Sequence, residues 1–257
     1  MAYNLYVPTP FYHLSVAEDL LKRPDLSSGI RDFLKHYRPD FLFGNTAPDV
    51  QTISGQPRPV THFFDVPIPP GASLAWDALL TVHPQLVATV LKNQSQAAFL
   101  AGYLCHLQAD WLWVLDIFVP IFGPWSTWQT LKQRLYLHNV LRAYLDRQIL
   151  DGLQSQIDGE LEAARPFHWL PFVEDPYLLK WRDLLAQQLH PGAIAQTVEV
   201  FAIRQGIDPQ AFYKLLESED RLEQEIFSKL PREDLDRYRQ RLMDENVRLL
   251  NQYLAML

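Results

Sequence analysis

The sequence has very little cysteine and no excess of basic residues. Its 257 residues include one cysteine, Cys105, which excludes a disulfide framework and an all-thiolate zinc site. The 23 lysines and arginines are outnumbered by 30 aspartates and glutamates, and the resulting net charge of −7 argues against binding to duplex nucleic acid. No long low-complexity stretch is present and 12% of the residues are aromatic, which argues against extended disorder.

Targeting and membrane signals are also scarce. The N-terminal residues show no basic stretch followed by an apolar run, so we expect no secretory signal and a cytoplasmic location. The apolar stretch from Phe99 to Trp125 is long enough to span a bilayer, but it contains His106, Asp110 and Asp116. Because a carboxylate near the bilayer centre costs about 2.5–3.5 kcal/mol, we expect a buried core helix and no transmembrane segment.

The remaining patterns are helical. A serine cap precedes an expected helix at 30–37, and helical spacing returns from 73 and runs through 97–121 and 126–153. Between them, residues 44–72 are rich in proline and glycine and are expected to form a long irregular loop. No strand pair is evident. The sequence therefore predicts an all-α fold.

The pattern of helix-breaking residues changes at about Pro166. Prolines divide the following residues into shorter helices, and the last segment, 232–257, is densely charged with one apolar face. We interpret residues 1–165 as a helical core that binds metal and residues 166–257 as a C-terminal helical extension packed on it.

Four short patterns carry candidate metal ligands. His106 and Asp110 are four residues apart on an expected helix, which points both side chains to one face. Asp49 follows a proline in the long loop, His62 follows a threonine there, and His13 precedes a helix among large apolar residues. Taken singly, these are also typical of a hydrogen-bonded core pair, a turn cap, a partly exposed histidine and a core histidine.

Taken in order, the four patterns resemble those of the zinc-dependent phospholipase C family, which is related to the metal-dependent single-strand nucleases. The resemblance covers roughly residues 10–146. It implies a helical fold around a zinc cluster that hydrolyses phosphate esters. It also implies five metal ligands, among which the last bridges two metals: His13, Asp49, His62, His106 and Asp110.

The chemistry of these side chains agrees with the resemblance. Imidazole and carboxylate groups suit zinc, with manganese or iron as other possible divalent ions. One metal on Asp49, His62, His106 and Asp110 is nearly saturated by protein, whereas a second on His13 and Asp110 keeps positions open for water. We therefore expect one or two zinc ions, with Asp49 and Asp110 as the catalytic residues and Asp49 as a proton acceptor as well.

The chain departs from the family pattern at a further metal site. The resemblance places Asp116 and His138 there as ligands, but Arg142 stands where a carboxylate is expected, and its positive charge repels a cation. Asp146 is a substitute one turn later. We expect at most two metals, with Asp116 paired to Arg142 or His138. Phosphate is expected to bind Arg142 or Arg134.

The sequence thus predicts a hydrolase acting on a small phosphate ester. One alternative is a non-enzymatic interaction protein that keeps a structural metal and binds its partner through the C-terminal helices, which could also form a homo-oligomer. A weaker alternative is a single-strand nuclease, against which the acidic charge and the absence of a basic–aromatic stripe argue.

Overall fold

A computed structural model describes residues 7–126 and 130–255. Within these ranges every regular element is helical and no strand occurs, so the predicted all-α class is confirmed. The elements up to residue 122 are α1 (Pro10–Leu20), α2 (Ser28–His36), α3 (Arg38–Gly44), η1 (Ala47–Val50), α4 (Gln51–Ser54), α5 (Arg58–His62), α6 (Ala75–Val82), η2 (Pro84–Leu91), α7 (Gln94–Trp113) and η3 (Val114–Phe122). The later ones are α8 (Leu131–Ile157), η4 (Leu161–Ala163), α9 (Asp175–Leu189), α10 (Thr197–Gln205), α11 (Pro209–Leu216), α12 (Glu219–Leu222), η5 (Glu223–Phe227) and α13 (Arg232–Tyr253).

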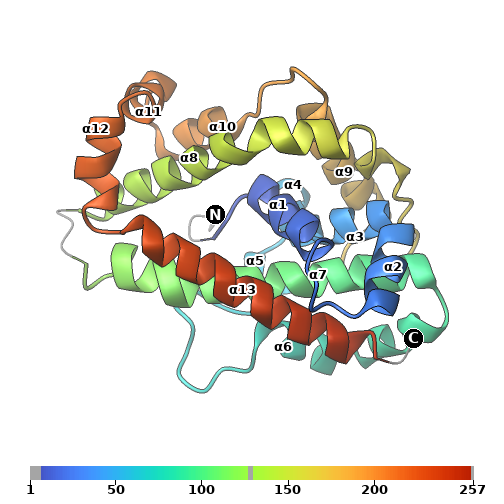
Figure 1. Cartoon of the computed structure of the whole chain (residues 1–257). Coiled ribbons are helices and arrows are strands. Elements are labelled where there is room, and N and C mark those ends of the chain that lie inside the picture. The colour runs from blue at the N-terminus through green and yellow to red at the C-terminus, as the bar shows by residue number, and fades with distance from the viewer. Residues whose placement is uncertain (1–6, 127–129, 256–257) are drawn as a thin grey trace.

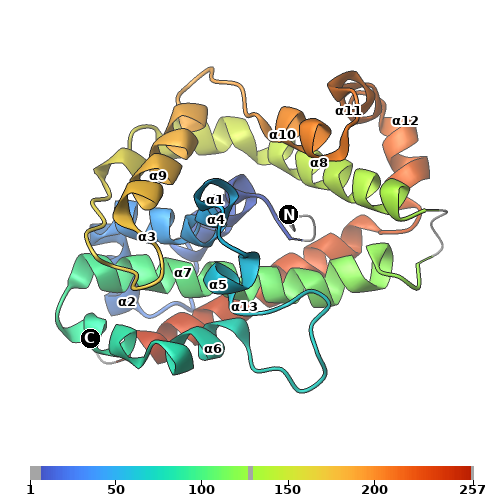
Figure 2. The ribbon, with the colours of Figure 1, turned by 180° about the vertical axis from the view of Figure 1, so that it is seen from behind.

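Three long helices frame the molecule. In Figure 1 α8 crosses the upper part, while α7 and α13 run together through the lower part, and α1 lies between the two levels. Figure 2 shows the same arrangement from behind. Helix α1 contacts α7, α8 and α13. A side chain on α1 that faces α7 therefore lies near the centre of the fold.

Helix α7 is the central element, and every residue from Ala97 to Trp113 is buried. Two glycines allow α3 to cross it closely. A Cβ atom on Gly44 would lie 1.9 Å from the Phe99 carbonyl oxygen, and one on Gly102 would lie 2.2 Å from the Phe41 carbonyl oxygen. Only glycine fits at either position, and the contact carries the chain after α3 directly over α7.

The proline-rich segment 44–72 is not the uniform loop that its breakers predict. It contains η1, α4 and α5, and a proline stands in the first turn of η1 and of α5. Proline has a backbone angle suited to the first turn of a helix and lacks only an N–H that would have no helical partner there. The prolines therefore begin short helical turns in this segment.

The C-terminal segment packs on the rest of the chain and shares one hydrophobic core with it. Trp181 of α9 donates a hydrogen bond from Nε1 to the Thr46 carbonyl oxygen at 2.8 Å. Tyr238 of α13 donates one from its hydroxyl to the Ala109 carbonyl oxygen of α7 at 3.0 Å. The apolar face predicted for the last helix thus lies against α7.

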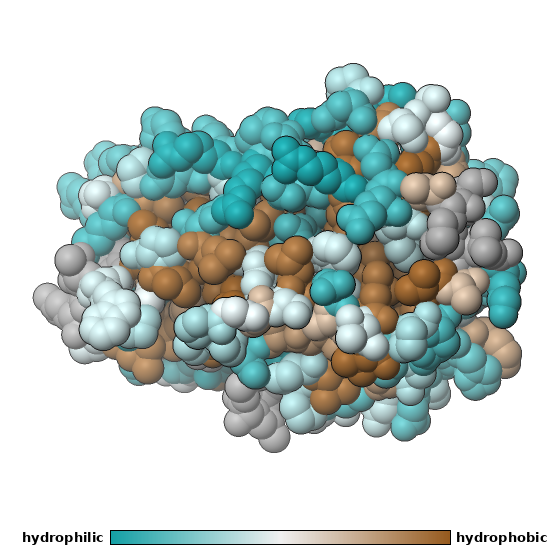
Figure 3. Space-filling model, turned by 90° about the horizontal axis from the view of Figure 1, so that it is seen from below, coloured by the Kyte–Doolittle hydropathy of each residue, from teal (hydrophilic) through white to brown (hydrophobic). Residues whose placement is uncertain are grey.

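Residues Gln94–Phe122 are long and apolar enough to cross a membrane by length and composition. The structure buries 72% of the most apolar window of this segment inside the fold, as expected for the core helix that the sequence predicts. Seen from below, the molecule shows hydrophobic side chains in a band across its middle, with hydrophilic ones along its edges (Figure 3). Partial exposure of apolar side chains is ordinary for folded proteins.

Candidate metal centre

Five side chains that the sequence analysis singled out converge at the centre of the fold. His13 comes from α1, Asp49 from η1, His62 from the end of α5, and His106 and Asp110 from α7. All five are buried, with at most 1% of each residue exposed. Burying this many ionisable groups is costly unless they pair with one another or with a metal.

The i,i+4 spacing on α7 brings His106 and Asp110 together as predicted. His106 Nε2 lies 3.6 Å from Asp110 Oδ2. On the other side of the ring, His106 Nδ1 lies 2.8 Å from the Asn45 carbonyl oxygen, which follows the close crossing of α3 and α7. A proton on Nδ1 satisfies that carbonyl, and it leaves the Nε2 lone pair directed at the cluster.

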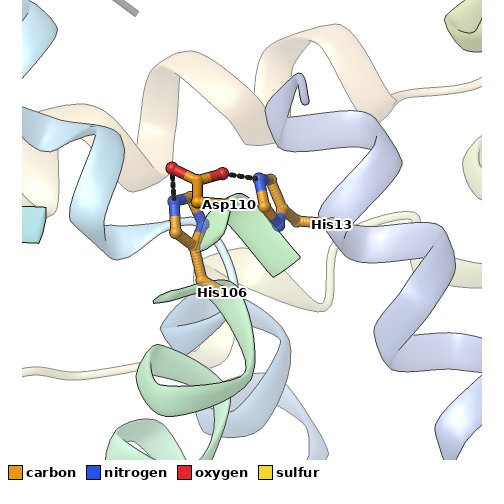
Figure 4. A group of neighbouring side chains, drawn as sticks. All are labelled: His13, His106 and Asp110. Atoms are coloured by element: carbon orange, nitrogen blue, oxygen red, sulfur yellow. Dashed lines mark ion pairs between the residues drawn. The ribbon is translucent and has the colours of Figure 1, made fainter. Parts of the chain in front are cut away.

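Asp110 contacts histidines through both of its oxygens. Its Oδ1 lies 3.2 Å from His13 Nε2, and its Oδ2 lies 3.4 Å from His62 Nε2. Figure 4 shows the carboxylate between His13, from α1, and His106, from its own helix. The rings of His13 and His106 stack with their centroids 3.7 Å apart. Asp110 would therefore offer one carboxylate oxygen to a metal on the His13 side of the cluster and the other to a metal on the His62 side.

The loop ligands complete a second group beside the first. Asp49 Oδ1 lies 3.5 Å from His62 Nε2, and His62 Nε2 lies 3.4 Å from His106 Nε2. Thr61 Oγ1 lies 2.9 Å from His62 Nδ1, while the Thr61 carbonyl accepts a hydrogen bond from the Tyr103 hydroxyl. These contacts hold the Nε2 side of His62 toward His106.

The donor set fits a divalent metal. Ligand atoms of His13, His106 and Asp110 form one group within 4.8 Å of each other, and those of Asp49, His62 and His106 form another. When both rings carry their proton on Nδ1, the Nε2 lone pairs of His62 and His106, 3.4 Å apart, cannot hydrogen bond to each other, but both can bind one cation. Among the described residues, neither nitrogen of His13 makes a hydrogen bond, and Asp110 Oδ1 makes none. A metal would satisfy these buried atoms.

The charges of the cluster follow from burial and from its carboxylates. Burial opposes ionisation of Asp110, but His106 and His13 hold the pKa of that carboxyl well below its usual range. Burial, together with the positive charge of Arg58, lowers the pKa of His62 to about 4. Burial and His106 also lower the pKa of His13. At neutral pH the cluster therefore offers two neutral imidazoles and an ionised carboxylate, the forms that bind metal.

Arg58 is a site residue that the sequence analysis missed. Its Nη2 donates a hydrogen bond to Asp110 Oδ2 at 2.7 Å, and its guanidinium lies over the Phe64 ring, 4.5 Å from the centroid. A signal was present, because Arg58 precedes His62 by four residues, and a single helical turn places both on one face. A positive charge is thus built into the metal centre.

The structure does not bring Asp116 and His138 into the cluster. Asp116 lies on η3, beyond the end of α7, and it pairs with Arg241 Nη1 at 2.6 Å. The expected pairing of Asp116 with Arg142 or His138 is therefore wrong. His138 Nε2 accepts a hydrogen bond from Trp113 Nε1 at 3.0 Å, and neither residue belongs to a group of possible metal ligands among the described residues.

The two arginines expected to bind phosphate differ in position. Arg134 Nη1 donates to the carbonyl oxygens of Phe122, at 3.3 Å, and of Gly123, so it closes the turn after η3. Arg142 lines a cavity that Asp49 also lines. Asp146, the expected substitute ligand, accepts hydrogen bonds from the hydroxyls of Thr9 and Thr197 instead.

Comparison with known proteins agrees with this geometry. Residues 12–113 match the family model of zinc dependent phospholipase C, and this span contains His13, Asp49, His62, His106 and Asp110. No curated protein and no solved structure matches the chain. Over residues 12–113, the chain is therefore similar to the zinc-dependent phospholipase C family.

Proposed function

We propose that this protein is a metal-dependent hydrolase of phosphate esters. The observation that carries the proposal is that five buried candidate ligands, from four elements, form two groups. Both groups contain His106, and Asp110 of the first lies beside His62 of the second. A single structural metal needs only four ligands, so the additional histidine, His13, favours a catalytic centre.

Asp49, His62, His106 and Asp110 would hold one ion, and His13 and Asp110 would hold a second. Nitrogen and oxygen donors without thiolate suit zinc, with manganese or iron as alternatives, and the proposal is for one or two ions per chain. Such ions supply an activated water at neutral pH and stabilise the charge on a phosphoryl group.

The protein residues would position the reactants and accept a proton from the attacking water. Asp49 lies at the boundary between the metal groups and the cavity, and its carboxylate would accept a proton from the attacking water. Burial opposes ionisation of Asp49, but His62 and His106 lower the pKa of that carboxyl, which keeps it ionised and able to accept a proton. Arg142 would donate hydrogen bonds to a phosphate oxygen.

The test combines metal analysis with a hydrolysis screen. Purified protein is measured for zinc, manganese and iron and is assayed on phosphomonoesters and phosphodiesters. Asp110→Asn is expected to lose bound metal and hydrolysis, because it removes the shared negative charge. Asp116→Asn is the matched control, since Asp116 pairs with Arg241 at the partly exposed end of η3 and should retain both. Full metal content in Asp110→Asn would overturn the proposed site.

Arg58 favours a second candidate, a non-enzymatic interaction protein with a structural metal. The guanidinium already neutralises part of the charge of Asp110, which reduces the need for a second ion. Bound metal with no hydrolysis of any ester in the screen would support this candidate.

The proposal also includes a small phosphate-ester substrate and a cytoplasmic location. The single cysteine, Cys105, is buried and free, which is typical of a protein that does not depend on disulfides. A homo-oligomer through the C-terminal helices stays a prediction, which light scattering during size-exclusion chromatography tests.

A further inference from the structure

A cavity of about 210 Å³ adjoins the metal centre at Asp49. Its walls combine two parts of the chain. Asp49, Thr52 and Ile53 lie within the residues that match the family, whereas Arg142 on α8 and the lining residues on α9 and α10 lie outside them. The properties of this cavity therefore come largely from the chain's own C-terminal half.

Two guanidinium groups line the cavity. Arg142 is only 3% exposed, and its side chain is fixed by hydrogen bonds from Nη1 to Asn139 Oδ1 at 2.9 Å and from Nη2 to the Pro8 carbonyl oxygen at 3.4 Å. Its guanidinium lies 4.4 Å from the centroid of the Phe201 ring. Arg204, three residues further along α10, lines the same cavity.

The two positive charges influence each other. Burial lowers the pKa of Arg142 to about 10, with Asp146 and Asp49 opposing the shift and Arg204 adding to it, so the Arg142 guanidinium remains charged at neutral pH. Of the nearby carboxylates, Asp49 belongs to the metal centre, and Asp146 is hydrogen bonded by Thr9 and Thr197. Two arginines that line one cavity are typical of a site for a phosphate group.

The rest of the wall is apolar and the space is small. Phe11, Ile53, Trp181, Leu184 and Val200 contribute aromatic and aliphatic surface. A volume of about 210 Å³ is below the range of roughly 300–1,000 Å³ that is usual for drug-sized ligands. It suits a phosphate with one compact apolar group and leaves little room for the two acyl chains of a phospholipid.

We propose that Arg142 and Arg204 form a phosphate subsite that selects small phosphate esters with a compact apolar organic group. For the reaction itself, this inference rests on the proposed hydrolase function. The binding of such phosphate esters is argued from the cavity and its arginines alone.

The test is calorimetric binding of phenylphosphonate, a phosphate-ester analogue whose carbon–phosphorus bond is not hydrolysed, to the full-length zinc-loaded protein. Arg204→Gln should weaken binding by about tenfold to hundredfold, because a hydrogen bond to a charged group contributes about 1.5–3 kcal/mol. Arg237→Gln is the matched control, since Arg237 is exposed and pairs with Asp234 outside the cavity. Zinc content and melting temperature are measured for each variant.

The outcomes separate the two proposals. Binding that depends on Arg204, without hydrolysis of any phosphomonoester or phosphodiester in the screen, supports the subsite and contradicts the hydrolase. Hydrolysis with unchanged phenylphosphonate binding in Arg204→Gln overturns the subsite and leaves the hydrolase standing. Binding of dihexanoylphosphatidylcholine as tight as that of phenylphosphonate would overturn the selection for small ligands.

Discussion

Replacing Arg58 with methionine tests the charge balance of the metal centre. In the structure the guanidinium contacts Asp110 Oδ2 at 2.7 Å, and both side chains are buried. A metal that binds Asp110 must share this carboxylate with a positive charge. Two unit charges 4 Å apart at an effective dielectric of ~20 interact by about 4 kcal/mol, and a divalent ion doubles that repulsion. Methionine keeps an unbranched side chain over the Phe64 ring but removes the charge.

We expect two effects of opposite sign. Zinc affinity should rise at least about tenfold, which corresponds to about 1.4 kcal/mol. This gain is well below the full Coulomb repulsion between Arg58 and the metal, because in the wild type the arginine side chain can relax away from the ion. In the absence of metal, the free energy of unfolding should fall by about 3–5 kcal/mol, because Asp110 loses its buried partner. Zinc should therefore raise the melting temperature of the variant far more than that of the wild type.

The assay is a zinc titration against a competing chelator, with thermal melts in EDTA and in zinc. Arg239→Met is the control. Arg239 also pairs with a carboxylate, Asp19 at 2.7 Å, but that pair joins α1 to α13 and includes none of the five candidate ligands. The control should lose stability equally with and without zinc. An unchanged or weaker zinc affinity in Arg58→Met would refute the charge argument.

Three further predictions follow from the same structure. Gly102→Ala should cost several kcal/mol of folding stability and lower the zinc content, because its Cβ would meet the backbone of α3. Gly29→Ala, with open space around the new Cβ, should be tolerated. Equal melting temperatures of the two variants would contradict this prediction. Bound zinc should be lost on acidification, because the histidines take up protons. Asp110 raises the pKa of His106 against the effect of burial, so His106 should be protonated at a higher pH than His62, whose pKa is about 4. The zinc content measured after dialysis across pH 4–7 checks this prediction. Burial raises the pKa of Asp146 to about 6, so the folded state binds the proton of this carboxyl more tightly than the unfolded state does. The contribution of Asp146 to the free energy of unfolding should therefore grow as the pH falls from 7 through 6. Unfolding of Asp146→Asn in EDTA should lack this pH-dependent contribution, and identical pH profiles of the variant and the wild type would contradict the prediction.

The sequence alone predicted the parts of the site that depend on local geometry. Helical spacing at 97–121 predicts α7, and the four-residue spacing of His106 and Asp110 places both on one helix face whatever the rest of the chain does. The same local reasoning failed for the segment 44–72, where prolines begin short helices as readily as they end long ones. It also missed Arg58, although its spacing from His62 is the same as that of the α7 pair.

The family resemblance suggested that His13 and Asp49 join this pair, but their proximity is a property of the tertiary structure. It depends on α1 lying between α7 and α8, and on two glycines that let α3 cross α7 closely enough for the Asn45 carbonyl to reach His106. Contacts between distant residues also explain why Asp116 and His138 lie outside the cluster, since Arg241 and Trp113 provide them with other partners. Spacing along a helix is set by the backbone and can be read from the sequence. The meeting of helices depends on side-chain packing across the whole fold, so only the tertiary structure decided which charged groups share the metal centre.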